Sequence, residues 1–109
     1  MNKPTRFYSN KQEQHVAKAL GGKQVANSGA TPFYKGDVVL DDWLFECKTR
    51  MRPAQGMSLR KEWLEKNKEE AFAMGKPYSA LVINFGDMEN YYIVDEKTFK
   101  KLMEGNYEN

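Results

Sequence analysis

The stretch "GDVVLDDWLFECKTR" (residues 36–50) decides the fold. Two apolar runs flank the pair Asp41-Asp42, a pattern typical of a β-hairpin with strands Asp37–Leu40 and Trp43–Thr49. If the turn is centred on the two aspartates, Asp37 lies directly opposite Glu46. Directly opposed residues have Cβ atoms about 4.5–5.5 Å apart and point to the same face of the sheet. The hairpin therefore predicts two converging carboxylates.

Strand alternation places Lys48 on the same face as Glu46 and turns Trp43, Phe45 and Cys47 toward the core. Opposed like charges destabilise a sheet, so the two carboxylates need a compensating charge. Mg²⁺ fits this need, because it is typically held by one or two carboxylates and retains several waters; Mn²⁺ is a possible substitute. The backbone carbonyl of Cys47 is a further candidate ligand, whereas its thiol is not. The alternative is an ordinary surface ion pair between Glu46 and Lys48.

The rest of the chain predicts helices alternating with short strands. The expected elements are a helix opened by Ser9 and stopped by Gly21-Gly22, a strand near Val25, a helix from Ser58 to about Met74, strands in "YSALVINF" and "YYIV", and a helix capped by Asp95. The order α-β-β-β-α-β-β-α predicts an α/β fold, a mixed sheet flanked by helices. With 109 residues, we expect one domain spanning 1–109.

Composition indicates a soluble protein. No apolar run approaches the roughly 20 residues that span a bilayer, so we expect no membrane partner. The start "MNKPTRFYSN" lacks the apolar segment of a secretory signal. A single cysteine suits a reducing compartment. These features predict a cytoplasmic protein, in the host cytoplasm if it is phage-encoded.

Basic residues concentrate immediately after the hairpin, in "KTRMRPAQGMSLRK". The candidates for contact with nucleic-acid phosphates are Arg50, Arg52, Arg60 and Lys61. The net charge of +2 is small, so the prediction of phosphate contacts rests on the clustering of the basic residues and not on the overall charge of the chain. A solvated charge run is the alternative interpretation.

At the level of motifs, "GD" followed after an apolar hairpin by "ECK" resembles the PD-(D/E)xK nuclease superfamily. With Glu13 in an upstream helix and the loop "NSGA", the chain is most similar to archaeal-type Holliday junction resolvases and their phage relatives. The resemblance implies a restriction-endonuclease-like fold and an active site of Glu13, Asp37, Glu46 and Lys48. It also matches Ser28 to a serine of that loop, a candidate DNA contact. One departure is Gly36, which precedes Asp37 where the family has proline or an apolar residue.

The implied activity is Mg²⁺-dependent, structure-selective cleavage of DNA, with a four-way junction or other branched DNA as the substrate. Asp37 and Glu46 are then the metal ligands, and Glu13 is a third ligand or acts through a water. Lys48 orients the attacking water or neutralises charge in the transition state. Alternatives are a nuclease for nicks, flaps or linear duplex DNA, a non-catalytic DNA-binding module, and a structural subunit. The number of metal ions stays open.

We also expect a symmetric homodimer, because resolving a junction takes two opposed incisions and two-fold dimers are the commonest oligomers. The interface candidates are the outward tyrosine of "YYIV", Phe72, and the segment around Phe33 and Tyr34. Two other side chains are given structural roles. His15 is expected at the surface or in a helix contact, and Trp63 on the apolar stripe of its helix.

Overall fold

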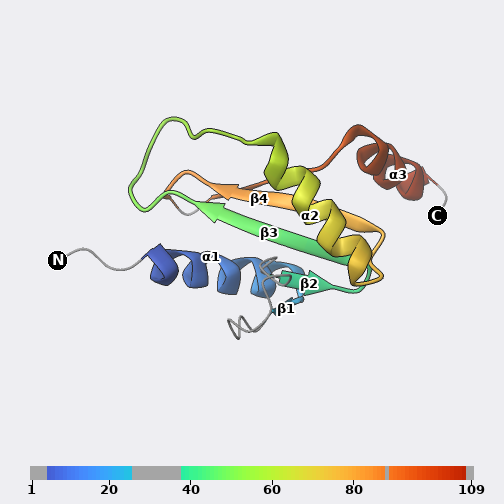
Figure 1. Cartoon of the computed structure of the whole chain (residues 1–109), viewed down its shortest axis with the longest axis horizontal. Coiled ribbons are helices and arrows are strands. Elements are labelled where there is room, and N and C mark those ends of the chain that lie inside the picture. The colour runs from blue at the N-terminus through green and yellow to red at the C-terminus, as the bar shows by residue number, and fades with distance from the viewer. Residues whose placement is uncertain (1–4, 26–37, 88, 108–109) are drawn as a thin grey trace.

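The computed structural model of the chain describes residues 5–25, 38–87 and 89–107 (Figure 1). Its elements are α1 (Thr5–Leu20), β1 (Lys23–Gln24), β2 (Val38–Leu40), β3 (Trp43–Thr49), α2 (Lys61–Ala73), β4 (Tyr78–Asn84), β5 (Asn90–Ile93) and α3 (Glu96–Tyr107). The predicted order of helices and strands is therefore confirmed within the described residues.

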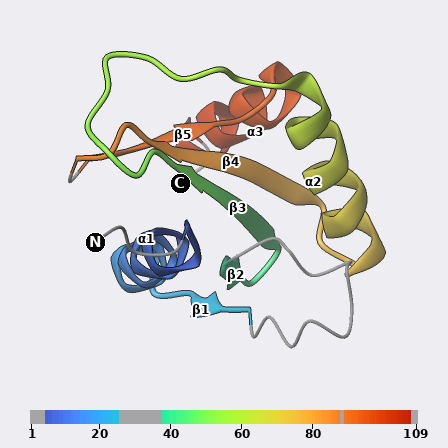
Figure 2. The same cartoon turned by 60° about the vertical axis from the view of Figure 1, so that its left-hand side comes forward.

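The strands form one mixed five-stranded sheet in the order β1-β2-β3-β4-β5. The pairs β1–β2, β2–β3 and β4–β5 are antiparallel, and β3–β4 is parallel. A parallel pair needs a crossover connection, which α2 supplies. Figure 2 shows α1 and α2 on opposite sides of the central strands. The mixed α/β class expected from the sequence is confirmed.

The register of the hairpin is the predicted one. Val38 pairs with Phe45, Val39 with Leu44, and Leu40 with Trp43. The turn consists of Asp41 and Asp42, and Asp41 has a positive φ of 46°. Aspartate tolerates this left-handed conformation better than most residues, since its short polar side chain bonds locally. The turn thus fixes the register of the hairpin, and that register determines which residues of the two strands lie opposite each other at the site.

The core lies mainly between α1 and the sheet. Its buried residues are Val16, Val38, Phe45, Cys47, Ala80 and Val82. Phe45 is stacked on Trp43 with ring centroids 5.4 Å apart. Phe45 and Cys47 therefore point to the core, as alternation along β3 requires. The Cys47 thiol is buried in this apolar cluster, on the core side to which strand alternation assigns it.

Both long helices begin elsewhere than predicted. α1 begins at Thr5, so Ser9 lies inside the helix and does not cap it. α2 begins at Lys61 with Arg60 as its N-cap residue, which makes no side-chain capping bond, and Ser58 lies outside the helix. Capping is worth about 1 kcal/mol, and packing of the helix faces overrides so small a preference.

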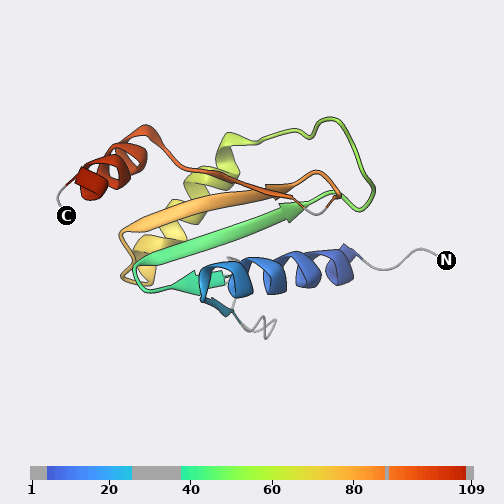
Figure 3. The same cartoon turned by 180° about the vertical axis from the view of Figure 1, so that it is seen from behind.

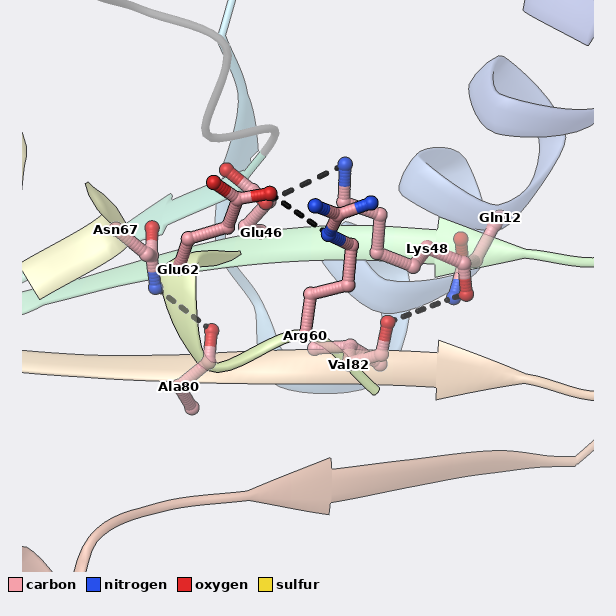
Figure 4. A network of polar contacts seen from close by, with 8 residues as sticks. All are labelled: Gln12, Glu46, Lys48, Arg60, Glu62, Asn67, Ala80 and Val82. Atoms are coloured by element: carbon pink, nitrogen blue, oxygen red, sulfur yellow. Dashed lines mark hydrogen bonds and ion pairs between the residues drawn. The ribbon is translucent and has the colours of Figure 1, made fainter. Parts of the chain in front are cut away.

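Two buried amide side chains tie the parallel strands together from opposite sides. From α1, Gln12 Nε2 donates hydrogen bonds to the carbonyls of Lys48 (3.1 Å) and Val82 (3.2 Å). From α2, Asn67 Nδ2 donates to the carbonyl of Ala80 at 3.0 Å (Figure 4). Because each amide bridges a helix to backbone in the sheet, α1, β3, β4 and α2 are held as one unit.

The last helix, α3, is capped as predicted but lies apart from the sheet. Asp95 Oδ1 accepts a hydrogen bond from the Thr98 N–H (2.7 Å), and its Oδ2 pairs with Lys68 of α2 at 2.6 Å. Figures 1 and 3 show α3 beyond the end of the sheet. Within the described part of the chain, no helix combines the length and apolar character needed to cross a bilayer.

The Asp95 cap is expected to hold the start of α3 in a pH-dependent way. Hydrogen bonds from Lys68 first, and then from Thr98, hold the pKa of Asp95 well below its ordinary value of 3.8. A carboxylate with a depressed folded-state pKa stabilises above its unfolded pKa, and this stability is lost as pH falls through the folded pKa. Amide-exchange protection in the first turn of α3 should therefore decline below about pH 4.

The Asp95→Ala variant should have the lower protection already at neutral pH. Equal protection in this variant and the wild type, measured by exchange with mass spectrometry, would show that Asp95 does not anchor the helix. Asp87→Ala is the matched control, since Asp87 is an exposed aspartate outside α3.

Candidate active site

The acid-x-lysine motif lies on the central strand β3, and the structure brings its two charges together. Lys48 Nζ is 3.5 Å from Glu46 Oε2, with the Glu46 side chain only 10% exposed and that of Lys48 35% exposed. Both residues alternate with Phe45 and Cys47, so they point away from the α1 side of the sheet. The ion pair of the alternative interpretation is therefore present, but its glutamate is buried and not solvated.

Trp63 is a member of this site that the sequence interpretation assigned to the apolar stripe. Its ring lies on α2, and Lys48 Nζ is 4.7 Å from the ring centroid. A cation over an indole face is attracted by about 0.5–2 kcal/mol, more when water is excluded. The Lys48 ammonium is thus held between a carboxylate and an aromatic face. The only sequence signal for this contact was a tryptophan near the start of the helix that follows the acid-x-lysine motif.

Glu13 is buried on α1, with 8% of its surface exposed. Its Oε1 accepts a hydrogen bond from Gln24 Nε2 of β1 at 3.2 Å. Gln24 is paired with Val38, the first residue of β2. Glu13 therefore lies beside the entrance of the hairpin. A buried carboxylate is costly unless it has partners, and the Gln24 amide is one of them. The part of Glu13 in an active site stays a prediction.

Two predicted site residues, Asp37 and Ser28, lie outside the described residues. The same holds for the interface candidates Phe33 and Tyr34. The observed register ends at the pair Val38–Phe45, one step before the position that the prediction gives to Asp37 and Glu46. The convergence of these two acids stays a prediction.

The donor chemistry of the site suits a hard divalent cation. Among the residues that the structure describes, no group of three or more histidine, cysteine or acidic side chains could hold a metal ion. Glu46 presents a buried carboxylate, and Mg²⁺ takes oxygen ligands, often from only one or two carboxylates; a metal site at Glu46 stays a prediction. The Cys47 carbonyl is an oxygen donor of the same kind, and its role as a ligand stays a prediction.

The basic residues lie along an irregular segment that leaves the site at the end of β3. Arg50 and Arg52 are exposed, and so are Arg60 and Lys61 at the start of α2. Figure 4 places Arg60 beside Glu62, with Arg60 Nε 2.7 Å from Glu62 Oε1. This pair is exposed and worth little to stability, and contact of Arg60 with a phosphate stays a prediction.

The segment is fixed at its base. The Arg50 N–H donates to the carbonyl of Asn84 (3.0 Å), and the Ala54 N–H donates to that of Phe85 (2.9 Å). Gly86, with φ +94°, lies so close that an added Cβ would be 2.4 Å from the Arg52 carbonyl oxygen. Arg50 and Arg52 therefore start from an ordered backbone next to Lys48.

Other candidates have the roles expected of them or none in the site. His15 is exposed on α1, as predicted. Tyr91 and Tyr92 are both about half exposed, whereas the sequence predicts only one outward tyrosine in "YYIV". Burial first, and then the neighbouring Cys47, raises the pKa of Tyr92 above its ordinary value of 10.

Comparison with known proteins adds no assignment: no protein-family profile matches the chain, and neither a curated protein nor a solved structure is significantly similar to it.

Proposed function

We propose that the protein is a Mg²⁺-dependent, structure-selective DNA endonuclease, and that it resolves Holliday junctions. The observation that carries this proposal is the Glu46–Lys48 pair on the central strand. A buried carboxylate 3.5 Å from a lysine that itself retains access to solvent is suited to metal-assisted phosphodiester hydrolysis. The Glu46–Lys48 pair has no evident role in a sheet that serves the fold alone.

The topology supports the same proposal. A helix, an antiparallel three-stranded meander, a crossover helix and a parallel fourth strand are compatible with a restriction-endonuclease-like fold. Glu46 and Lys48 lie on β3, the strand that pairs with antiparallel β2 on one side and parallel β4 on the other. Fold alone does not determine function, so the site is the main argument and the topology is secondary.

Each residue has a distinct part in the proposed reaction. Asp37 and Glu46 would hold the metal ion, with Glu13 as a further or water-mediated ligand. Mg²⁺ bound there would supply an activated water and stabilise charge on the scissile phosphate. Lys48, oriented by Glu46 and Trp63, offers its ammonium protons to the phosphate oxygen on which charge develops. Arg50 and Arg52 bind flanking phosphates.

The proposed substrate is a four-way junction or other branched DNA, and the proposed assembly is a homodimer. Two active sites related by a two-fold axis make two opposed cuts, as resolution of a junction requires. A panel of labelled junction, flap, nicked and linear duplex DNA tests this. We expect the junction to be cut fastest with Mg²⁺, and Mn²⁺ to substitute. Faster cutting of flaps or nicks would assign the protein to that class of nuclease.

Replacing Arg50 and Arg52 together by alanine should weaken DNA binding to a similar extent for every sequence. Contacts to phosphate release counterions and carry no sequence information, so the slope of log K against log salt should become shallower by roughly two units. Fluorescence anisotropy at several salt concentrations measures both quantities. Lys97 and Lys101 on α3 are the control pair, because they lie away from the site. An unchanged slope in the Arg50/Arg52 variant would place these arginines outside the DNA interface.

A further inference from the structure

The last helix has an apolar stripe that the described part of the chain leaves uncovered. Phe99 is 54% exposed, Leu102 45% and Met103 38%. With spacings of three and four residues, they lie within about 100° of arc on one side of α3. The charged residues of the helix lie outside that arc and are Glu96, Lys97, Lys100, Lys101 and Glu104. Such a stripe is typical of a helix that packs on another surface.

No described helix or strand packs along α3. Lys68 and Asp95 fix its start to α2, and Figure 3 shows the helix beyond the end of the sheet. The helix has 12 residues. Isolated helices shorter than roughly 12–15 residues are marginal in water, and most helical stability in proteins comes from packing of the apolar face. A stable α3 therefore needs a partner surface.

The strand from which α3 continues has an open edge. β5 is the terminal strand among those described, and it pairs only with β4 in the sheet order. Its residues Asn90–Ile93 contain no proline and no charge, which are the usual protections of an edge against pairing with another chain. The half-exposed rings of Tyr91 and Tyr92 flank this edge on its two faces.

We propose that β5 and α3 together form the interface with a second copy of this chain. An edge strand pairs antiparallel with the same edge of a copy related by a two-fold axis, because a two-fold axis normal to the sheet reverses the strand direction. The apolar stripe of each α3 then packs against apolar surface of the other copy. The charged residues of α3 lie outside the stripe and stay in water, so the cost of burying a charge is avoided. The net charge of +2 opposes the approach of two copies only weakly.

The exposed area is in the range that a dimer needs. At roughly 200 Å² for a large side chain, the exposed fractions of Tyr91, Tyr92, Phe99, Leu102 and Met103 sum to roughly 450 Å² per protomer. A standard interface buries about 800 Å² per partner, of which about 56–65% is apolar, or roughly 450–520 Å². The patch supplies most of this amount.

The inference rests on the homodimer of the proposed function for its biological meaning, but it is tested without DNA or metal. Sedimentation equilibrium at micromolar protein should give a dimer for the wild type. Leu102→Glu on α3 and Tyr91→Lys on the β5 edge should each raise the dimer dissociation constant at least about tenfold, since each buries charges in the interface. Phe72→Glu tests the interface candidate on α2 that the sequence suggested. Phe72 is 83% exposed and lies outside the β5–α3 patch, so this variant should associate like the wild type.

Amide exchange supplies a readout that needs no substitution. Protection of α3 and β5 in the wild type should rise with protein concentration, and Leu102→Glu should abolish the rise while circular dichroism shows the sheet intact. A wild-type monomer at micromolar concentration would overturn the proposal. So would a dimer that persists in both Leu102→Glu and Tyr91→Lys, or one that is lost in Phe72→Glu. DNA cleavage is measured in a separate assay, so none of these results decides whether the protein is a nuclease.

Discussion

Replacing Glu46 by glutamine is expected to abolish metal-dependent DNA cleavage, with a loss of at least about a thousandfold in the single-turnover rate. Glutamine keeps the shape but removes the charge that holds the cation, and metal catalysis supplies several kcal/mol of transition-state stabilisation. The fold should be retained. Because the prediction opposes Glu46 to a second carboxylate, the metal-free variant should melt at the wild-type temperature or above it.

Lys48→Ala should have a comparable effect on the rate, since it removes the positive charge at the phosphate. Glu62→Gln is the matched control, because Glu62 is an exposed acid that pairs with Arg60 near the same helix start. It should cleave at close to the wild-type rate. Full activity in Glu46→Gln with intact protein would refute the assignment of the site, and a loss in Glu62→Gln as large as that in Glu46→Gln would extend the site to α2.

The second large effect is expected from Gly86→Ala, at about 2–4 kcal/mol of the free energy of unfolding. Gly86 has φ +94°, and an added Cβ would lie 2.4 Å from the carbonyl oxygen of Arg52 and 2.8 Å from the nitrogen of Pro53. All of these contacts are backbone, so no side-chain rotation can relieve them. The base of the basic segment must move, and DNA affinity should fall with stability.

Two other glycines distinguish the two causes of this loss of stability, which are backbone strain and the close approach to Arg52. Gly75 has φ +73° with no atom within 4 Å of an added Cβ, so Gly75→Ala should cost only the backbone strain, about 1 kcal/mol. At Gly56 an added Cβ is also free of contacts and the backbone is not left-handed, so Gly56→Ala should be close to neutral. Urea denaturation gives all three values. If Gly86→Ala cost no more than Gly75→Ala, the close approach to Arg52 would not be present in solution.

The parts of the fold set by local chemistry could be predicted from the sequence. The register of the β2–β3 hairpin follows from a two-residue turn between apolar runs. The Asp95 cap follows from an aspartate directly before the helix, and its bond to the Thr98 N–H confirms it. The pairing of Glu46 with Lys48 on one face follows from strand alternation alone. These features depend on residues a few positions apart.

The features that sequence did not give depend on distant contacts. Gln12 lies in a helix expected from the sequence, yet it bonds to the carbonyls of Lys48 and Val82, 36 and 70 positions away. Trp63 was placed on the core stripe, and its contact with Lys48 depends on how α2 crosses the sheet. The exposure of α3 is a further case, because an apolar stripe in a sequence does not reveal what covers it.

The proposed nuclease is tested most directly by single-turnover cleavage of a labelled four-way junction in the presence of EDTA, Mg²⁺, Mn²⁺ or Ca²⁺. The wild type should cut with Mg²⁺ and Mn²⁺ and be inactive in EDTA, and Glu46→Gln should be inactive under every condition while still binding the junction. Cleavage that persists in EDTA, or no cleavage of any DNA by a protein that folds and binds Mg²⁺, would contradict the assignment of Glu46 and Lys48 to a metal-dependent active site.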